Sequence, residues 1–415
     1  MKKATIVVAA VLAALAFAVP TAGAQADRSA TCVNGMAGQF PCKNIDLLSY
    51  LTMEEIGGGQ VVGTGRGSDV WGWRDPQTGR EYAIAGRENG TSFIDITNPR
   101  QPVYLANLPS ASTSNVIWRD IEVYKSHAFI VSEASGHGMQ VFDLRRLRDI
   151  SPSEAPATVT ADVRYTQFLR AHTIAINEET GYAYAVHSVQ GPTTCSRGLH
   201  MVDIRNPKSP TFAGCATATG PVHEAQCVIY RGPDARFRGR ELCFASSPEP
   251  DSVVVVDVTS KISPVVIADI PYEGSAYSHQ GWLTKDQRYF LHGDELDEPG
   301  FGHTTRTRIW DMSDLTAPRV SGNYFSTTPA IDHNMYVVRT HVFQSNYSAG
   351  LRVLGLLDID QGKLTEVGYF DVYPPHDNPG FGFGTWGNYP FFKSGVVAVH
   401  GYQGLWLVKP RVPKR

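Results

Sequence analysis

A strand-turn-strand pattern that returns about every 50 residues constrains the fold of this chain more than any other feature. Its first copy, GTSFIDITNPRQPVYLANLP from Gly90 to Pro109, has a β-rich run that ends in an aspartate, then an Asn-Pro turn and a second β-rich run. The pattern returns around the aspartates Asp95, Asp143, Asp203, Asp257, Asp311 and Asp358, which we interpret as turn formers. A repeat of this length made only of short strands is typical of β-propeller blades. We therefore predict an all-β fold that consists of a single β-propeller.

Each repeat can be expanded into four antiparallel strands. The predicted innermost strands open at or near Asp69, Asp120, Ala171, Val222, Ser278, Asp332 and Trp386. Seven openings predict seven four-stranded blades, with six or eight as the alternatives. The last copy, GLWLVKP from Gly404 to Pro410, lacks an outermost strand, and the β-rich run Ile45–Leu51 could supply it. We therefore expect residues 60–415 to form the propeller and residues 27–59 to form a lead-in whose strand closes the last blade, which removes the open sheet edge.

The N-terminus has the features of a secretory signal peptide. Lys2 and Lys3 precede an apolar run from Ile6 to Val19, and Ala24–Ala26 forms an A-x-A cleavage site. The apolar run is short for a membrane span of about 20 residues, which was the alternative. We predict that residues 1–26 are removed and that the mature chain has no transmembrane segment. The protein is then expected to be secreted, either extracellular or periplasmic, and monomeric.

All six cysteines follow the predicted signal peptide, and export permits disulfide bonds. Fifteen pairings are possible in principle. One pair brackets a glycine-rich loop and a second pair falls on strands that we expect to be antiparallel neighbours, which leaves the remaining two cysteines for each other. The expected pairs are therefore Cys32–Cys42, Cys227–Cys243 and Cys195–Cys215. A cysteine-bound metal is the alternative, but the chain contains no C-x-x-C pair.

The charge of the chain argues against nucleic-acid binding. The formal net charge is −3, with 37 lysines and arginines against 40 aspartates and glutamates. The basic residues form no stripe of the kind that contacts phosphates. The partners that remain are a small molecule, a protein or a polysaccharide.

One position at the start of each innermost strand is polar in six repeats. Aligned with one another, the openings read Asp69, Asp120, His172, His223, His279 and His333. Because the innermost strand of a blade lines the central channel, these side chains should form a ring at one mouth. Imidazole and carboxylate groups are ligands of zinc and similar divalent metals, so the ring is a candidate metal site. The alternative is that the same residues have a structural role and cap the loops between blades.

The same mouth should also receive the ends of the second strands, because two strands joined by a hairpin start and finish together. This places further titratable residues near the ring. Glu133 or Glu224 could act as a general base, and His187 or His292 could donate a proton, in a metal-assisted hydrolase or lyase.

Two loops could complete this mouth. The acidic run that contains Asp294, Glu295 and Asp297 could bind calcium through oxygen ligands, although a solvated loop is the alternative. The glycine- and aromatic-rich loop from Pro374 to Pro390 could form a lid or a binding wall.

Several segments resemble a known family. The repeat V-x-V-x-D-I-T-N-P-x-x-P resembles the LVIVD repeat. Longer segments resemble choice-of-anchor B proteins, namely WRDIEVYKSHAFIVSEASGHGMQVFDL, AHTIAINEETGYAYAVH, HEAQCVIYRGPD, SHQGWLTKDQRYFLHGDELDE and TRTRIWDMSDL. The resemblance runs from the Cys32–Cys42 region to Trp406, and it implies a secreted or surface-attached β-propeller whose relatives differ in their C-terminal anchor. This chain shows no such anchor, so we expect a freely soluble form; the resemblance implies no activity.

Together these features predict a secreted β-propeller that binds a ligand at a mouth lined by histidine and aspartate. The candidate cofactor is a divalent metal, zinc or similar, with calcium as the alternative. Two other functions remain open: a metal-assisted hydrolase or lyase that uses the same mouth, and an extracellular protein or polysaccharide scaffold that contains no metal.

Overall fold

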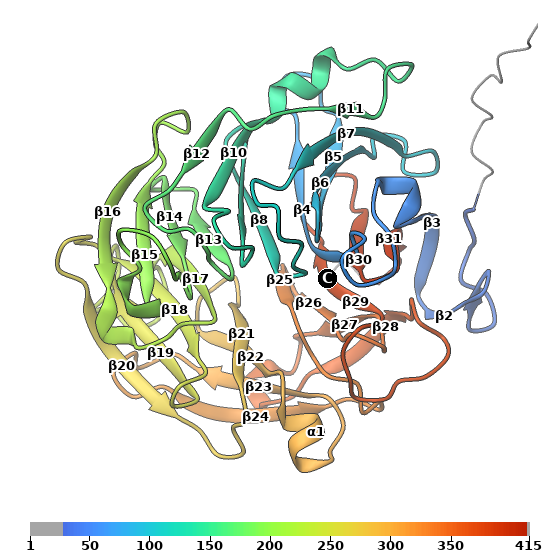
Figure 1. The fold of residues 1–415 in the computed structure, drawn as a ribbon. Helices are drawn as coiled ribbons and strands as arrows, with labels where there is room; N and C mark the ends of the chain where they lie inside the picture. The colour runs from blue at the N-terminus through green and yellow to red at the C-terminus, as the bar shows by residue number, and fades with distance from the viewer. Residues whose placement is uncertain (1–27, 413–415) are drawn as a thin grey trace, which may run out of the picture.

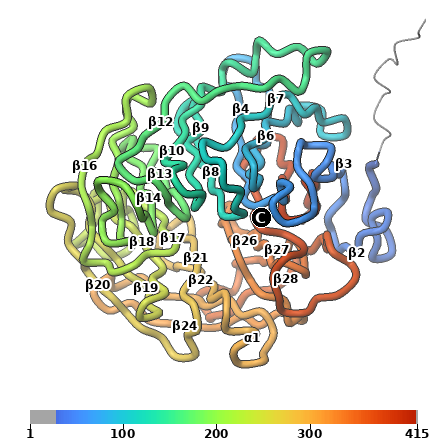
Figure 2. The backbone as a smooth tube through the Cα atoms, in the orientation of Figure 1, coloured from blue at the N-terminus to red at the C-terminus, as the bar shows by residue number. Residues whose placement is uncertain are grey.

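The computed structural model describes residues 28–412, so the predicted signal peptide at residues 1–26 lies outside the described part. Seven antiparallel β-sheets surround a central axis, and the chain passes around the ring from blue to red (Figure 1). The innermost strands contact one another in the order β4, β8, β13, β17, β21, β25, β29 and again β4, which closes the circle. The tube in Figure 2 shows the same circular path of the backbone. The structure confirms a single seven-bladed propeller.

Each blade has four strands in radial order. The innermost strands are β4 (Gly67–Arg74), β8 (Arg119–Tyr124), β13 (Ile174–Asn177), β17 (Glu224–Ile229), β21 (Ser278–Leu283), β25 (Met335–Val338) and β29 (Thr385–Tyr389). The second strands are β5 (Glu81–Arg87), β9 (His127–Ser132), β14 (Tyr182–Ala185), β18 (Glu241–Ser247), β22 (Tyr289–Asp294), β26 (His341–Ser345) and β30 (Val397–Gly401). The third strands are β6 (Gly90–Asp95), β10 (Met139–Asp143), β15 (Leu199–Asp203), β19 (Ser252–Asp257), β23 (Arg306–Asp311), β27 (Leu351–Gly355) and β31 (Gly404–Pro410). The outermost strands are β7 (Val103–Pro109), β12 (Val163–Tyr165), β16 (Thr211–Ala216), β20 (Val265–Pro271), β24 (Arg319–Phe325), β28 (Thr365–Phe370) and β3 (Ile45–Thr52).

The other elements are short. Three small strands, β1 (Met36–Ala37), β2 (Phe40–Lys43) and β11 (Ala157–Thr158), extend the rims of blades, and β11 pairs with β7 as a fifth, parallel strand of blade one. One α-helix, α1 (Asp297–Phe301), follows β22, and 3-10 turns lie at Glu54–Ile56, Leu144–Asp149, Cys195–Arg197, Thr217–Thr219 and Ile359–Gln361. No helix in residues 28–412 has both the length and the apolar character that a membrane span requires.

The N-terminal lead-in closes the ring, as predicted. Strand β3 pairs antiparallel with β31, from Ile45 opposite Pro410 to Thr52 opposite Gly404. The pairing is reinforced where the ring of Tyr50 stacks on Trp406 with 4.9 Å between the ring centroids. The hairpin β1–β2 also pairs with β28 of blade six, so the lead-in joins two blades and covers their outer edges.

Local sequence explains the repeated blade geometry. In β19, the run SVVVVD is buried throughout, because the blade packs against a neighbour on each face and β-branched side chains fit that environment. At the end of the third strand, five of the six repeat aspartates accept a hydrogen bond from the backbone N–H two residues later: Asp95 from Thr97 (2.9 Å), Asp143 from Arg145 (3.1 Å), Asp203 from Arg205 (3.0 Å), Asp257 from Thr259 (2.9 Å) and Asp311 from Ser313 (2.9 Å). The sixth, Asp358, lies beyond β27 and instead precedes the 3-10 turn Ile359–Gln361. These bonds confirm the turn-forming role expected for the five aspartates.

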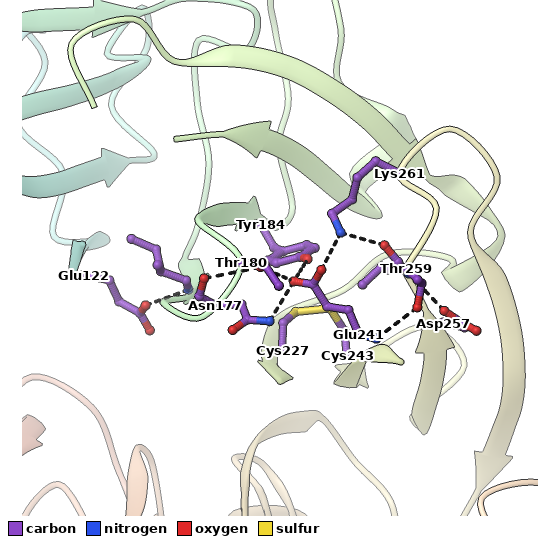
Figure 3. Close-up of a disulfide and its surroundings, with 12 residues drawn as sticks. Glu122, Asn177, Thr180, Tyr184, Cys227, Glu241, Cys243, Asp257, Thr259 and Lys261 are labelled. Atoms are coloured by element: carbon purple, nitrogen blue, oxygen red, sulfur yellow. Dashed lines mark hydrogen bonds and ion pairs between the residues drawn. A yellow bond between two sulfur atoms is a disulfide. The ribbon is translucent and has the colours of Figure 1, made fainter. Parts of the chain in front are cut away.

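The three expected disulfides are present: Cys32–Cys42, Cys195–Cys215 and Cys227–Cys243. The third joins β17 to β18 directly across the sheet, with the two Cα atoms 4.0 Å apart (Figure 3). The lead-in bond ties the ends of the β1–β2 hairpin.

Candidate functional site

The four predicted histidines lie side by side at one mouth of the channel. The ring centroids are 4.3 Å apart between His172 and His223, 4.3 Å between His223 and His279, and 4.5 Å between His279 and His333. All four line one narrow pocket. Its free volume is about 10 Å³, which is room for about one water molecule. The pocket itself can therefore hold a single ion, whereas an organic ligand would have to bind above it.

The start of each innermost strand places these side chains. His279 lies inside β21, whereas His172, His223 and His333 come one or two residues before β13, β17 and β25. Blade seven has Trp386 at the aligned position, and its ring lies 4.9 Å from that of His333. The arrangement is thus an arc of histidines that ends against a tryptophan.

In three of the histidines, a contact to Nδ1 orients the ring and leaves Nε2 available as a ligand atom. The Nδ1 atom of His172 is 2.6 Å from Oε1 of Glu133, that of His223 is 3.2 Å from the carbonyl of His279, and that of His333 is 2.5 Å from the carbonyl of Trp386. Carbonyl and carboxylate oxygens accept, so Nδ1 carries the proton and Nε2 keeps its lone pair. This outer contact is the usual arrangement around metal-ligating histidines.

One glutamate completes a compact group with two of these histidines. The ligand atoms of His279, Glu295 and His333 all lie within 4.8 Å of one another. Oε2 of Glu295 is 3.7 Å from Nε2 of His279, and Oε1 is 3.7 Å from Nε2 of His333. The hydroxyl of Tyr347 donates to Oε1 of Glu295 at 2.7 Å and orients it. Two imidazoles and one carboxylate form a donor set that suits zinc and leaves positions open.

Burial sets the protonation of this group. Burial, followed by the charges of neighbouring histidines, lowers the pKa of His223 and His279 well below the usual range. Burial also lowers the pKa of His333 to about 3. These rings are therefore neutral at pH 7, the form that binds metals. Burial raises the pKa of Glu295 to about 7, although the hydrogen bond from Tyr347 opposes the rise.

The two predicted aspartates do not join the compact group. Asp120 lines the pocket, and its Oδ2 accepts from the backbone N–H of Ile174 at 2.7 Å, which ties blade two to blade three. Asp69 is 1% exposed, and neither of its carboxylate oxygens has a hydrogen-bond partner. Burial, and then the charge of Asp120, raises the pKa of Asp69 well above its usual range. With Glu224, whose pKa is raised by burial and by Asp120, these residues make the channel beside the histidines acidic.

The two candidate bases differ in environment. Glu133 accepts from Arg170 at 2.9 Å and from His172. Burial alone would raise the pKa of Glu133, but His172 and Arg170 outweigh it and lower the pKa to about 2, so this carboxylate is a weak base. Glu224 lines the histidine pocket and has no such cation beside it. It is the better placed of the two to exchange a proton.

The two candidate proton donors are also separated by the fold. His187 is half-buried, and its pKa is lowered by burial and then by the charge of His172, which lies nearby. His292 is fully buried within blade five, where Nε2 lies 3.1 Å from the hydroxyl of Ser278 and the ring packs on Tyr272. His292 is not among the residues that line the histidine pocket.

The three residues of the predicted acidic run have different partners. Both oxygens of Asp294 accept hydrogen bonds, Oδ2 from Tyr272 at 2.6 Å and Oδ1 from the backbone of Tyr277 at 2.7 Å. Glu295 turns to the histidines, and Asp297 pairs with two arginines. Glu295 directly follows β22, a second strand. Because the second strands return to the mouth, this position in the sequence could have predicted that Glu295 lies beside the histidines. Glu295 therefore faces the histidines and not the other acidic residues of the run, with which it was expected to bind calcium.

The loop from Pro374 to Pro390 contributes to the wall of the mouth. Trp386 lines the pocket, and Phe381 packs edge-on against Tyr347, with the ring centroids 5.3 Å apart. The hydroxyl of Ser348 donates to the carbonyl of Asn378 at 3.0 Å, which holds the loop to blade six. Aromatic side chains of this loop therefore pack against Tyr347, which donates to Glu295.

Comparison with known proteins supports the fold. No protein-family model matches the chain, and no curated protein matches it by sequence. Among solved structures, the β-propeller domain of Cps50 (Swd1) from Myceliophteria thermophila is similar, with 12% identity and a TM-score of 0.51 over 82% of this chain and 96% of that one. The structure of U3-55K is similar with 11% identity and a TM-score of 0.51 over 88% of this chain and 98% of that one. At such low identity these matches show the fold alone, an all-β seven-bladed propeller.

Proposed function

We propose that this chain is a secreted propeller of the choice-of-anchor B type, built from LVIVD-like repeats, that binds a divalent metal at its histidine-lined mouth and a ligand through that metal. The observation that carries the proposal is the convergence of His279, Glu295 and His333, whose ligand atoms lie within 4.8 Å of one another. The metal belongs to the zinc class, because two of the three donors are imidazole nitrogens.

The surroundings of the three residues fit such an ion. His333 is held through Nδ1 by a backbone carbonyl, and Glu295 is held by Tyr347, so two of the three ligands are oriented before an ion arrives. Three protein ligands leave at least one coordination position for water or for an atom of the ligand. Since the pocket has room for about one water molecule, the rest of a ligand would lie against the outer wall formed by Trp386 and its loop.

Export is part of the proposal and has its own support. The N-terminal residues read as a signal peptide, and three disulfides are present in the described part of the chain. Such bonds persist in oxidising compartments, which favours the extracellular space or the periplasm.

Metal content tests the proposal directly. The protein would be exported by its host, purified without nickel affinity, and assayed by elemental analysis and by calorimetric titration with Zn²⁺. We expect one zinc per chain in the wild type, and loss of that zinc in Glu295→Gln and His279→Asn. His376→Ala, in the loop from Pro374 to Pro390, is the matched control and should retain the zinc. If the folded wild-type protein binds no Zn²⁺, the proposed metal site is wrong. A metal-free scaffold for protein or polysaccharide would then be favoured.

A second candidate function is a metal-assisted hydrolase or lyase at the same mouth. It is favoured by Glu224, which lines the pocket with a pKa that burial raises, as a general base requires. Zinc-loaded protein would be assayed with ester, phosphoester and glycan substrates. Glu224→Gln should lower turnover by roughly 10²-fold or more while zinc stays bound. Inactivity of the zinc-loaded wild type toward every class would count against an enzyme.

A further inference from the structure

We propose a second cation site, rich in oxygen ligands, formed by Asp297, Glu298 and His303 with Asp332 beside them. It would take a hard divalent cation of the Ca²⁺ or Mn²⁺ class. Asp297 and Glu298 belong to α1, which Figure 1 shows at the rim beside β23 and β24, and Asp332 precedes β25 of blade six. The site goes beyond the proposed histidine centre and shares no ligand with it.

The ligand atoms already lie at the spacing of a coordination sphere. Those of Asp297, Glu298 and His303 all lie within 4.8 Å of one another, and Oδ1 of Asp297 is 3.9 Å from Nε2 of His303. Two ligands of one ion at about 2.0–2.6 Å from it lie roughly 3–4.5 Å apart. The Nδ1 atom of His303 donates to the carbonyl of Thr304 at 2.9 Å, so Nε2 presents a lone pair toward the carboxylate.

In each of the two carboxylates of α1, one oxygen accepts hydrogen bonds and the other has no hydrogen-bond partner. Oδ2 of Asp297 accepts from Arg306 (2.7 Å) and Arg308 (2.8 Å), whereas Oδ1 has no partner. Oε1 of Glu298 accepts from the backbone N–H of Arg306 at 3.0 Å, whereas Oε2 has no partner. Both residues are at most 1% exposed. Native structures satisfy nearly all buried polar atoms, so the neighbouring carboxylates of Asp297 and Glu298 call for a shared proton or a cation between them. The imidazole of His303, within 4.8 Å of both, favours the cation.

Asp332 adds an independent observation. It is 1% exposed, and neither of its oxygens has a hydrogen-bond partner. The nearby charges that act on it most strongly are those of Asp297 and then Asp294. A side chain at position 293 would place its Cβ 2.2 Å from Oδ2 of Asp332, so Gly293 provides the space that this carboxylate occupies.

The charges of this cluster favour a divalent cation. Four buried carboxylates gather here, on Asp294, Asp297, Glu298 and Asp332. The cationic side chains that face them are the guanidinium groups of Arg306 and Arg308. Glu295 also acts on Asp332, so the carboxylates outnumber the two guanidinium groups, and a Ca²⁺ or Mn²⁺ ion would offset part of the excess negative charge. Three carboxylates and a single imidazole favour such a cation over zinc.

The consequence for the fold is local. A bound cation would join α1 and the loop that follows it to the start of blade six. Glu295, which faces the histidines, lies only two residues before Asp297, so the cation would also steady the segment that carries it. We expect its removal to lower thermal stability and to loosen this segment.

Mn²⁺ binding to the full exported protein tests the proposal. After treatment with EDTA, the wild type and His279→Asn, which lacks a ligand of the histidine centre, would be titrated with Mn²⁺ by calorimetry and by electron paramagnetic resonance. Both should bind one Mn²⁺ per chain, and Mn²⁺ should raise their melting temperature. Glu298→Gln and Asp332→Asn should lose at least about 10-fold in Mn²⁺ affinity, and the rise in melting temperature should disappear. Asp269→Asn, an exposed aspartate on β20, is the matched control and should bind as the wild type does.

The outcomes separate this site from the histidine centre. Mn²⁺ binding that survives His279→Asn and is lost in Glu298→Gln supports the second site even if Zn²⁺ binding fails everywhere. A folded wild type that takes up neither Mn²⁺ nor Ca²⁺ overturns it, and the carboxylates then hold protons instead. Equal Mn²⁺ affinity in Glu298→Gln and wild type also overturns it. If the aspartate variant does not fold, His303→Gln, at a half-buried residue, gives the same test.

Discussion

Glu241 is the buried acceptor that joins blades three and four, and its removal is the sharpest stability test that the structure offers. It begins β18 and is 4% exposed. Oε1 accepts from Asn177 (2.7 Å), Thr180 (2.6 Å) and Tyr184 (2.5 Å), all in the β13–β14 hairpin of blade three (Figure 3). Oε2 accepts from Nζ of Lys261 at 2.6 Å. One carboxylate thus satisfies four donors, one of them a buried cation.

Glu241→Ala would leave the Lys261 ammonium, 9% exposed, without its counterion and three donors without an acceptor. Breaking a buried ion pair from one side costs about 3–5 kcal/mol, and each buried donor left unpaired costs about 1–3 kcal/mol before relaxation. Because these costs overlap, we expect the free energy of unfolding to fall by about 5 kcal/mol. An unfolding entropy of about 2.1 cal/mol/K per residue over about 385 described residues corresponds to about 0.8 kcal/mol/K. The melting temperature should then fall by about 6 °C.

Urea unfolding and thermal melts under non-reducing conditions would measure the effect. Glu241→Gln keeps an acceptor for the three neutral donors and should cost less than the alanine variant. The double variant Glu241→Gln with Lys261→Met removes both charges. Its loss in free energy of unfolding should be smaller than the sum of the two single losses by at least about 1 kcal/mol. A loss below about 1 kcal/mol for Glu241→Ala, or single losses that add within about 0.5 kcal/mol, would refute this account of the contact.

Three further predictions address pH, cross-linking and ring closure. Burial raises the pKa of Asp371 to about 6 from 3.8, against a hydrogen bond from Tyr373. The protonated Asp371 therefore contributes fully to stability below about pH 3.8, and this contribution is lost as the pH rises through 6. In urea unfolding, Asp371→Asn should have the same free energy of unfolding as the wild type at pH 4 and a higher one, by up to about 3 kcal/mol, at pH 7.5. An equal difference at both pH values would contradict this. Replacing Cys227 and Cys243 by alanine opens a loop with a sequence separation of 16 and should cost about 3 kcal/mol in the same assay; an unchanged denaturation midpoint would rule out a stabilising role. Leu47→Ala on the closing strand, 4% exposed, should cost about 2–4 kcal/mol, and a neutral effect would show that β3 does not hold the ring shut.

The architecture could be predicted from the sequence because every blade repeats the same local signals. Runs such as SVVVVD specify a strand buried on both faces, and the aspartate that follows specifies the turn. Seven copies, with the last one lacking a strand, then require a closing strand from elsewhere, which Ile45–Leu51 supplies within β3. Within a blade, the paired strands follow one another in the chain, so pattern and spacing were sufficient to predict them.

The candidate sites depended on contacts that spacing does not encode. One aligned histidine or aspartate in each of six blades predicted a ring at the mouth, because the start of each innermost strand faces the axis. Only the packed structure selects His279 and His333 with Glu295, through the bond from Tyr347 and the turn after β22. Side chains separated by tens of residues meet at distances set by blade packing and loop conformation, on a scale of a few ångströms. Ligand geometry is decided on that scale, so the sequence determined which residues reach the mouth, and the tertiary structure decided which of them can share an ion.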